Sequence, residues 1–410
     1  MHLKGSVSTG WRMEGCKMLT TGVAGAAMLI TLGNDPQASE PGQVAEPGKP
    51  IYVYVASYKS SSSNEEGDSP DSVGLSVFRF DPKAGALTPV QQVHSAYPSW
   101  VTLDASRRFL YACYSLNGRE THKYGAVEAY GINPDTGALQ LLNRVTQDIG
   151  GCAHLAVDPT GRYLIAANYL YGDFAVLPLE KDGRLGPVSS VFKDNGQGPH
   201  QRQDAPHPHA VVFSPDSRFI ATADLGNDKV QTLRLVDGRL EHVSDASVAP
   251  GMGPRHIAFS RDSKALYVIG ELNGTITTFS YDPATGKIGQ ILQTVSTEPD
   301  GYSGNHASAE IDVHPSGKFL YGSNRGSQTI VGYRIEPVTG KLTRIGFADN
   351  GLNFPNNFAF DPSGKWLYVV NMRGNNIAKF DIDPKTGDLK STGQVTPAVA
   401  PTMMVFRTPA

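Results

Sequence analysis

The chain has 410 residues and a nearly balanced charge, with 36 Lys and Arg against 39 Asp and Glu and a formal net charge of -3 at pH 7. This balance leaves no basic face for nucleic acid, so we expect no nucleic-acid partner. No apolar run in the body of the chain approaches the roughly 18 residues that span a bilayer, which predicts no membrane span in the mature protein. The 44 glycines and the recurrent turn dipeptides favour many short strands over helices.

The first 38 residues have the layout of a secretory signal. Arg12 and Lys17 precede an uncharged stretch from Met18 to Gly33, and small residues follow it. Basic, apolar and small-residue regions in this order are typical of export signals, so we predict a signal peptide over 1–38 and an exported or periplasmic protein. Residues 39–50, rich in Pro, Gly and Glu, are predicted to be a linker. The alternatives are a disordered tail or a mis-assigned start codon, with a cytoplasmic location.

Two cysteines, Cys113 and Cys152, lie beyond the predicted signal. Two cysteines permit at most one disulfide, and their spacing matches no metal-site pattern. Cys113 lies in an apolar run, which favours the role of a small buried hydrophobic residue.

A unit of similar length repeats through the chain. Seven similar apolar segments end at a turn or at the end of the chain, and successive segments are 46 to 56 residues apart. They are Trp100–Asp104, His154–Asp158, Ala210–Ser214, His256–Ser260, Glu310–His314, Asn357–Asp361 and Met403–Arg407. Turns such as Asp158-Pro-Thr-Gly161 lead into a second apolar run, and turns such as Asp383-Pro-Lys-Thr-Gly387 separate a third strand from a fourth. Four short antiparallel strands in this period indicate one blade of a β-propeller.

The two ends of the repeat region complement each other. The first repeat begins at Ile51 with a second strand and lacks a first one, whereas Met403–Arg407 is a first strand with nothing after it. Pairing these segments closes the ring and leaves only short, protected strand edges. The sequence therefore predicts an all-β, seven-bladed β-propeller over 51–407, closed by N- and C-terminal strands in one blade.

Two positions of each repeat are expected at one rim of the central channel. They lie five residues before and eleven residues after the last residue of each repeated apolar segment, such as Ser214. They adjoin because the first and second strands of a blade are antiparallel. Most blades carry small or neutral residues there, but three consecutive blades carry His209, Arg255, Glu271 and Arg325. Sites commonly lie at the ends of a rigid scaffold, so these four are the candidate catalytic residues. The alternative is a structural ion-pair network that joins the blades.

Two further patterns do not indicate a metal site. Asn or Asp recurs ten residues after most segment ends, at Asn168, Asp224, Asn324 and Asn371. Such side chains commonly bond the backbone at a strand exit, and we favour this capping role over a ring of metal ligands. Three histidines precede the fourth blade without the spacing of a zinc site, namely His200, His207 and His209.

Several short motifs resemble the seven-bladed β-propeller lactonase family, which includes 6-phosphogluconolactonases and 3-carboxy-cis,cis-muconate lactonizing enzymes. The motifs are Arg202-Gln203, Pro206-His-Pro-His209, Ser214-Pro-Asp216, Asp224-Leu-Gly-Asn-Asp-Lys-Val230, Gly253-Pro-Arg-His256, Glu271-Leu-Asn273 and Asn324-Arg325. The similarity covers essentially all of the chain from Ile51 to Arg407.

The resemblance implies a catalytic site made by the four rim residues found from the repeat, namely His209, Arg255, Glu271 and Arg325. It further implies that Arg202, His207 and Asn273 bind the substrate. Relatives often carry Pro-Arg at the start of the seventh blade, where this chain has Pro355-Asn356. This departure removes one expected contact to an anion.

Three functions fit these residues. The first is hydrolysis of a sugar lactone in the manner of a 6-phosphogluconolactonase, with Glu271 or His209 as general base. Arg255 and Arg325 would then stabilise the oxyanion or clamp an anionic group of the substrate. The second is a muconate-type cycloisomerase, and the third is a non-enzymatic exported propeller that binds a partner. We expect a small-molecule lactone as partner and no cofactor or metal, and the oligomeric state stays open.

Overall fold

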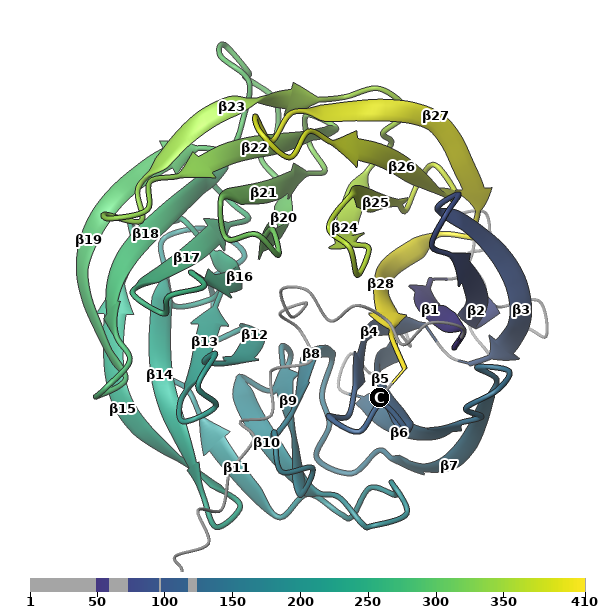
Figure 1. The fold of residues 1–410 in the computed structure, drawn as a ribbon. Coiled ribbons are helices and arrows are strands. Elements are labelled where there is room, and N and C mark those ends of the chain that lie inside the picture. Colours follow the sequence, from purple (N-terminus) through teal and green to yellow (C-terminus); the bar gives the residue numbers. More distant parts are fainter. Residues whose placement is uncertain (1–48, 59–72, 96, 117–123, 410) are drawn as a thin grey trace, which may run out of the picture. The chain divides into compact units, whose positions relative to one another are not determined.

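The computed structural model describes residues 49–58, 73–95, 97–116 and 124–409. The predicted signal peptide over 1–38 and nearly all of the predicted linker lie outside the described residues. Over the described ranges, 28 strands form seven four-stranded antiparallel sheets. The sheets surround a central channel, and one strand of each sheet lines it (Figure 1). No helix in these ranges is long and apolar enough to cross a membrane.

The innermost strands correspond to the seven repeated apolar segments. They are β28 (Pro401–Arg407), β4 (Pro98–Leu103), β8 (Cys152–Val157), β12 (Pro208–Phe213), β16 (Pro254–Phe259), β20 (Ser308–Val313) and β24 (Pro355–Phe360). The second strands are β1 (Ile51–Ser57), β5 (Phe109–Leu116), β9 (Tyr163–Asn168), β13 (Ile220–Asp224), β17 (Ala265–Gly270), β21 (Phe319–Asn324) and β25 (Trp366–Asn371). Strands such as β17 and β21 are buried along their whole length, since both of their faces pack against neighbouring blades.

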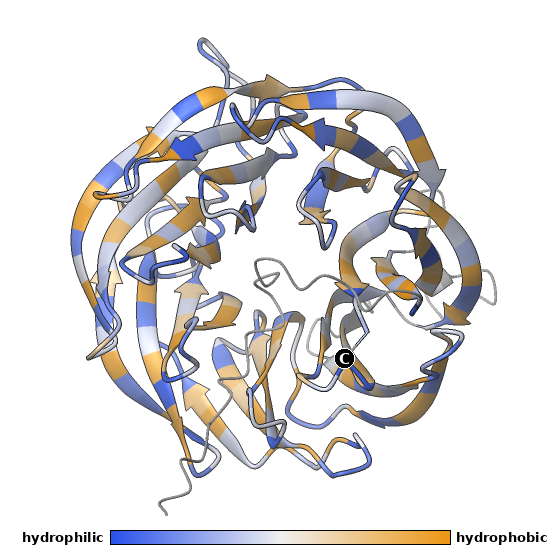
Figure 2. Cartoon of the chain, viewed as in Figure 1, coloured by the Kyte–Doolittle hydropathy of each residue, from blue (hydrophilic) through white to orange (hydrophobic). Residues whose placement is uncertain are grey.

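The outer strands complete each blade. The third strands are β2 (Val73–Asp81), β6 (Tyr124–Ile132), β10 (Asp173–Pro178), β14 (Lys229–Val236), β18 (Thr275–Asp282), β22 (Thr329–Ile335) and β26 (Asn376–Ile382). The fourth are β3 (Ala86–His94), β7 (Leu139–Val145), β11 (Ser190–Lys193), β15 (Arg239–Ser247), β19 (Lys287–Ser296), β23 (Leu342–Ala348) and β27 (Leu389–Pro397). Hydrophobic and hydrophilic residues intersperse along β19 and β27, which form the outer edge (Figure 2).

We number the blades along the chain. Blade 1 holds β28, β1, β2 and β3, and blades 2 to 7 hold the following strands in groups of four. In blade 1, β28 pairs with β1 so that Val53 lies opposite Phe406 and Tyr54 lies opposite Val405. The predicted seven-bladed propeller, closed by N- and C-terminal strands in one blade, is therefore confirmed.

Buried tyrosines join neighbouring blades through one recurring hydrogen bond. The phenol of Tyr321 donates to the carbonyl oxygen of Gly387 at 2.7 Å, across the junction between blades 6 and 7. Each acceptor is the positive-φ glycine of the turn between the third and fourth strands of the next blade. The same bond links Tyr54 to Gly137, Tyr111 to Gly183, Tyr267 to Gly340 and Tyr368 to Gly85.

The bond from Tyr368 to Gly85, at 2.7 Å, joins blade 7 to blade 1, the blade in which the ring closes. Changing Tyr368 to Phe keeps the ring that packs against Phe406 but removes the donor to a buried carbonyl. We expect the free energy of unfolding to fall by about 0.5–1.5 kcal/mol, measured by urea denaturation. Tyr302→Phe is the control, because the Tyr302 phenol bonds within its own loop. Equal losses in the two variants would contradict a role for this bond in ring closure.

Candidate active site

A β-bulge near the start of each innermost strand builds the rim of the channel. In six blades the pairing with the second strand skips one residue shortly after the innermost strand begins, and in blade 6 it skips both Ala309 and Glu310. In blades 4 and 5 the skipped residues are His209 and Arg255, each preceded by a proline that needs no ladder partner for its nitrogen. A bulge re-aims the side chain of the unpaired residue. The bulged backbone therefore directs the imidazole of His209 and the guanidinium of Arg255 to the rim.

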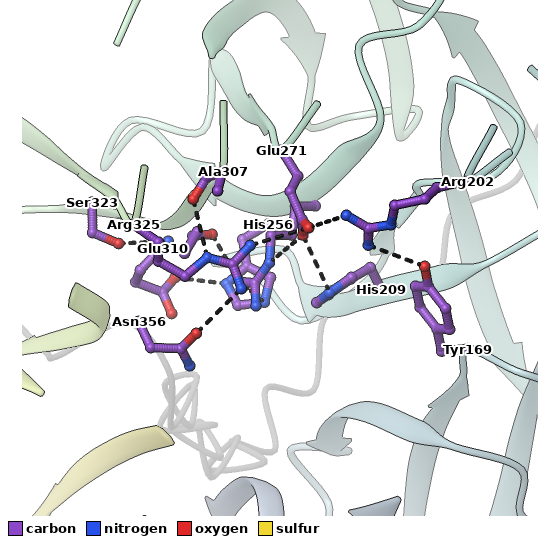
Figure 3. Close-up of polar contacts among 12 residues, drawn as sticks. Tyr169, Arg202, His209, His256, Glu271, Ala307, Glu310, Ser323, Arg325 and Asn356 are labelled. Atoms are coloured by element: carbon purple, nitrogen blue, oxygen red, sulfur yellow. Dashed lines mark hydrogen bonds and ion pairs between the residues drawn. The ribbon is translucent and has the colours of Figure 1, made fainter. Parts of the chain in front are cut away.

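Glu271 is the residue on which the cluster converges (Figure 3). It directly follows β17, and its carboxylate accepts from Arg202 Nη1 at 2.5 Å and from Arg255 Nε at 2.9 Å. Arg325, which directly follows β21, places Nη2 3.1 Å from the same carboxylate. The Nε2 atom of His209 lies 4.0 Å from it. The structure thus brings together all four residues predicted from the repeat, and Arg202 with them.

The charge of Glu271 is fixed by its neighbours. Its burial alone would raise the pKa of the carboxyl group. Arg325 and Arg255, with Arg202, outweigh burial and hold that pKa well below its usual range. Glu271 is therefore ionised at neutral pH. A carboxylate so strongly stabilised by cations is a weak acceptor of protons.

His209 has the opposite character. Burial, with smaller effects of Arg255 and His256, lowers the pKa of this imidazole well below 6.5, so the ring is neutral at neutral pH. Its Nδ1 atom is buried and has no hydrogen-bond partner among the described residues. Burial together with Arg325 also lowers the pKa of Arg255, to about 10, and Arg255 stays protonated. The site therefore combines a neutral imidazole with fixed guanidinium groups.

A buried glutamine fixes the loop that carries Arg202. Gln203 donates from Nε2 to the carbonyl of Leu225 at 2.8 Å and to Asp228 Oδ1 at 2.7 Å. Asp228 in turn accepts from the backbone nitrogen of Gly253, immediately before β16. These bonds fasten the Arg202 loop to blades 4 and 5. Arg202 can then reach Glu271, and its Nη2 lies 3.3 Å from the hydroxyl of Tyr169.

The two other residues predicted to bind substrate lie in different surroundings. His207 stacks on Tyr169, with ring centroids 4.5 Å apart, and its Nδ1 is 2.9 Å from the Tyr169 carbonyl oxygen. It therefore stands beside Arg202 at the rim. Asn273 lies in the turn between β17 and β18, where its side chain accepts a hydrogen bond from Thr275. A substrate contact for either residue stays a prediction.

The recurring Asn residues at the strand exits are structural. The Nδ2 atoms of Asn168, Asn324 and Asn371 donate to carbonyls of the loop that precedes their own blade. The expected bond to the backbone of the adjoining turn is made by Asp224, which accepts from the Gly226 nitrogen at 2.8 Å, whereas the three Asn side chains bond the preceding loop instead. In the ranges that the structure covers, no group of three His, Cys, Asp or Glu side chains is arranged to hold a metal ion. Cys113 and Cys152 are buried free thiols.

The comparison of repeats missed a second polar layer, one residue farther along the innermost strands. It contains His256, Glu310 and Asn357, which are hydrogen-bonded to one another. These are the first residues of three of the seven repeated segments, so comparing that position across blades would have found them. Tyr169 was also passed over, although it occupies the same repeat position as Glu271.

Known proteins share this fold over most of their length. The family described as Lactonase, 7-bladed beta-propeller, matches residues 52–406. The 6-phosphogluconolactonase of Bacillus subtilis is 33% identical over 309 residues, which are 75% of this chain and 84% of that protein. The 6-phosphogluconolactonase of Formosa agariphila is 31% identical over 305 residues, which are 72% and 84% of the two chains.

Solved structures agree with the sequence relatives. The periplasmic gluconolactonase of Pseudomonas aeruginosa is 30% identical with a TM-score of 0.79, over 88% of this chain and all of that one. The match to the family extends from the second residue of β1 nearly to the end of β28, and so includes every blade. This chain therefore belongs to the seven-bladed β-propeller lactonase family.

Proposed function

We propose that the protein hydrolyses a sugar lactone at the rim formed by His209, Arg255, Glu271 and Arg325. The observation that carries the proposal is the imidazole of His209, 4.0 Å from a carboxylate that also holds guanidinium groups in place. The relatives named 6-phosphogluconolactonase and gluconolactonase support the same class of substrate.

In the proposed reaction, neutral His209 takes a proton from water as the water oxygen bonds to the lactone carbonyl carbon. The negative charge that develops on the carbonyl oxygen is stabilised by Arg255 and Arg325, and one such donor is worth about 10²–10³ in rate. The tetrahedral intermediate collapses, the ring C–O bond breaks, and the imidazolium returns the proton to the leaving oxygen. The product is an open-chain hydroxy acid.

We assign the base to His209 rather than to Glu271, the choice that the sequence leaves open. The Glu271 carboxylate is stabilised by three arginines and accepts a proton poorly. Its role is to orient those arginines and to stabilise the imidazolium, which forms 4.0 Å away.

The charges at the rim favour an anionic lactone. Three guanidinium groups meet one carboxylate, which leaves an excess of positive charge. Arg202 is about half exposed. Arg373, which is exposed, stacks over the ring of Phe354 at 4.1 Å, and Arg325 stacks on the same ring at 5.4 Å. We therefore propose a 6-phosphorylated gluconolactone as the preferred substrate, with the phosphate held by the solvent-facing arginines.

A pH-stat assay corrected for spontaneous hydrolysis tests the proposal. Purified protein is given the δ-lactones of 6-phosphogluconate and gluconate, and a muconolactone. Acid release that is fastest with the phosphorylated lactone supports the full proposal, and release from gluconolactone alone refutes only the phosphate assignment. Reaction with the muconolactone alone favours the cycloisomerase. No acceleration with any of the three favours the binding propeller.

The depressed pKa of His209 predicts how the reaction depends on pH. A base whose pKa is lowered loses activity only when the pH falls through that lowered value. We expect kcat/KM to stay constant from neutral pH down through 6.5, the ordinary pKa of histidine, and to fall only at more acidic pH. Rates on the preferred lactone across the acidic range measure this profile. A decline centred above 6.5 contradicts the assignment of the base.

We also propose that the protein is exported. The order of basic, apolar and small residues over 1–38 supports this, as does a family member described as periplasmic. Cell fractionation of the producing organism, followed by N-terminal sequencing of the mature protein, tests it. A cytoplasmic protein that retains Met1 would refute export.

A further inference from the structure

A buried chain of hydrogen bonds lies directly beneath the rim. His256 on β16 places Nδ1 2.9 Å from Glu310 Oε1 on β20, and Glu310 Oε2 accepts from Asn357 on β24. On its other side, His256 Nε2 lies 3.2 Å from Nη1 of Arg255. Figure 3 shows His256 and Glu310 next to the Glu271 cluster. Three blades thus contribute to one chain of bonds that ends on a rim arginine.

This layer separates the rim from the rest of the channel. A cavity of about 490 Å³ lies on its far side, with mostly apolar walls and with His256, Glu310 and Asn357 in its lining. Arg255 and Glu271 do not line this cavity. His256 and Glu310 are only 4% and 7% exposed, so their polar atoms must find partners within the layer.

The partners determine which nitrogen of His256 carries the proton. Burial, with Arg255 and Arg325, keeps the pKa of His256 well below 6.5, so the neutral ring carries a single N–H. A guanidinium can only donate, so Nε2 must be the bare nitrogen that accepts from Arg255. The proton then resides on Nδ1 and is donated to Glu310.

We propose that His256 and Glu310 are positioning residues for Arg255, an inference that rests on the proposed lactonase function. Glu310 fixes the tautomer of His256, and that tautomer presents a lone pair to Arg255. Nη1 of Arg255 is held from below by His256 and by the Ala309 carbonyl at 2.9 Å, while Nε is held by Glu271. The other tautomer would set an N–H of His256 against an N–H of Arg255 and displace the guanidinium.

Two substitutions at Glu310 separate this role from a general effect of charge. Glu310→Leu removes the acceptor, whereas Glu310→Gln keeps a carbonyl oxygen that can accept from Nδ1. We expect Glu310→Leu to lower kcat by about 10- to 100-fold, as loss of outer-shell partners does elsewhere. KM should change little, because the misplaced arginine acts on the transition state. Glu310→Gln should recover part of the activity, because its carbonyl oxygen still accepts from His256 while its NH2 group faces the donating amide of Asn357.

Asp312→Asn is the matched control. Asp312 lies on the same strand and lines the same cavity, but its carboxylate bonds the backbone nitrogen of Val313. We expect wild-type kcat from this variant. If Glu310→Leu leaves kcat unchanged, or if Glu310→Gln falls as far as Glu310→Leu, the positioning role is refuted.

Nitrogen-15 NMR of the histidine rings tests the tautomer without any substrate. We expect Nδ1–H for His256 in the wild-type protein and a shift toward Nε2–H in Glu310→Leu. Nε2–H in the wild-type protein overturns the proposal, even if the leucine variant fails to fold. A wild-type protein that hydrolyses no lactone refutes the proposed function instead, and the NMR result still decides whether Glu310 sets the tautomer.

Discussion

Replacing His209 with glutamine is expected to lower kcat/KM for the preferred lactone by about 10²–10⁴-fold, the usual worth of a general base. Glutamine approximates the size of the imidazole but cannot take a proton from water. The ring is neutral because burial disfavours its charged form, so the wild-type base is available at neutral pH without prior deprotonation. Steady-state kinetics on the purified variant measure the loss.

A second buried histidine provides the control for this change. His314 directly follows β20, and its Nε2 lies 2.7 Å from the carbonyl oxygen of Gly364 in the next blade. His314→Gln should therefore lower the melting temperature and leave kcat/KM unchanged. If His209→Gln retains wild-type turnover while His314→Gln does not, His209 is not the base.

Replacing Glu271 with glutamine is expected to lower both activity and stability. The change leaves three guanidinium groups without their shared carboxylate, and breaking a buried ion pair usually costs about 3–5 kcal/mol. Repulsion among the arginines should also misplace Arg255 and Arg325, so kcat should fall because these two side chains no longer stabilise the oxyanion. Urea denaturation and steady-state kinetics measure the two effects. Inorganic phosphate should stabilise the variant more than the wild-type protein, since an added anion can take the place of the carboxylate.

Glu128→Gln tests whether the loss of activity is specific to the rim. Glu128 is a buried carboxylate on β6, and it accepts from Arg144 Nε at 2.6 Å and from the phenols of Tyr114 and Tyr130. This variant should lose stability without losing kcat/KM, and phosphate should not rescue it. Equal loss of activity in both variants would mean that Glu271 acts only through the stability of the propeller.

The ring and its closure were predictable because the repeat is visible in the residues themselves. The first strands of six blades are apolar segments followed by a turn and a second apolar strand. Met403–Arg407 is a first strand with no second strand after it, and the second strand that begins at Ile51 has no first strand before it. Four rim residues were predictable for the same reason. A charged side chain is conspicuous at a position where other blades have Ser99 or Ala153.

The residues of the layer beneath the rim can be located by comparing one more position of the repeat, but their hydrogen bonds cannot be predicted from that comparison. Histidine, glutamate and asparagine in an apolar strand resemble ordinary polar substitutions until their partners on other strands are known. The bond between His256 and Glu310 joins residues 54 positions apart, and only the curvature of the ring brings them to 2.9 Å. The protonation of His209 likewise depends on its burial, to which Tyr169 and His256 of the two neighbouring blades contribute, and no local spacing reveals this.

The bulge at the start of each innermost strand makes the rim side chain independent of the pairing between the first and second strands of its blade. Because a bulged residue takes no part in the ladder, its side chain can change while the pairing of the two strands persists. Thr402, Ser99, Ala153 and Asn356 are uncharged residues that occupy this position in four of the other blades. The same strand pairing can therefore carry a new specificity, one blade at a time, provided that each substitution replaces the bond that side chains such as Ser99, Thr402 and Asn356 make to the next blade.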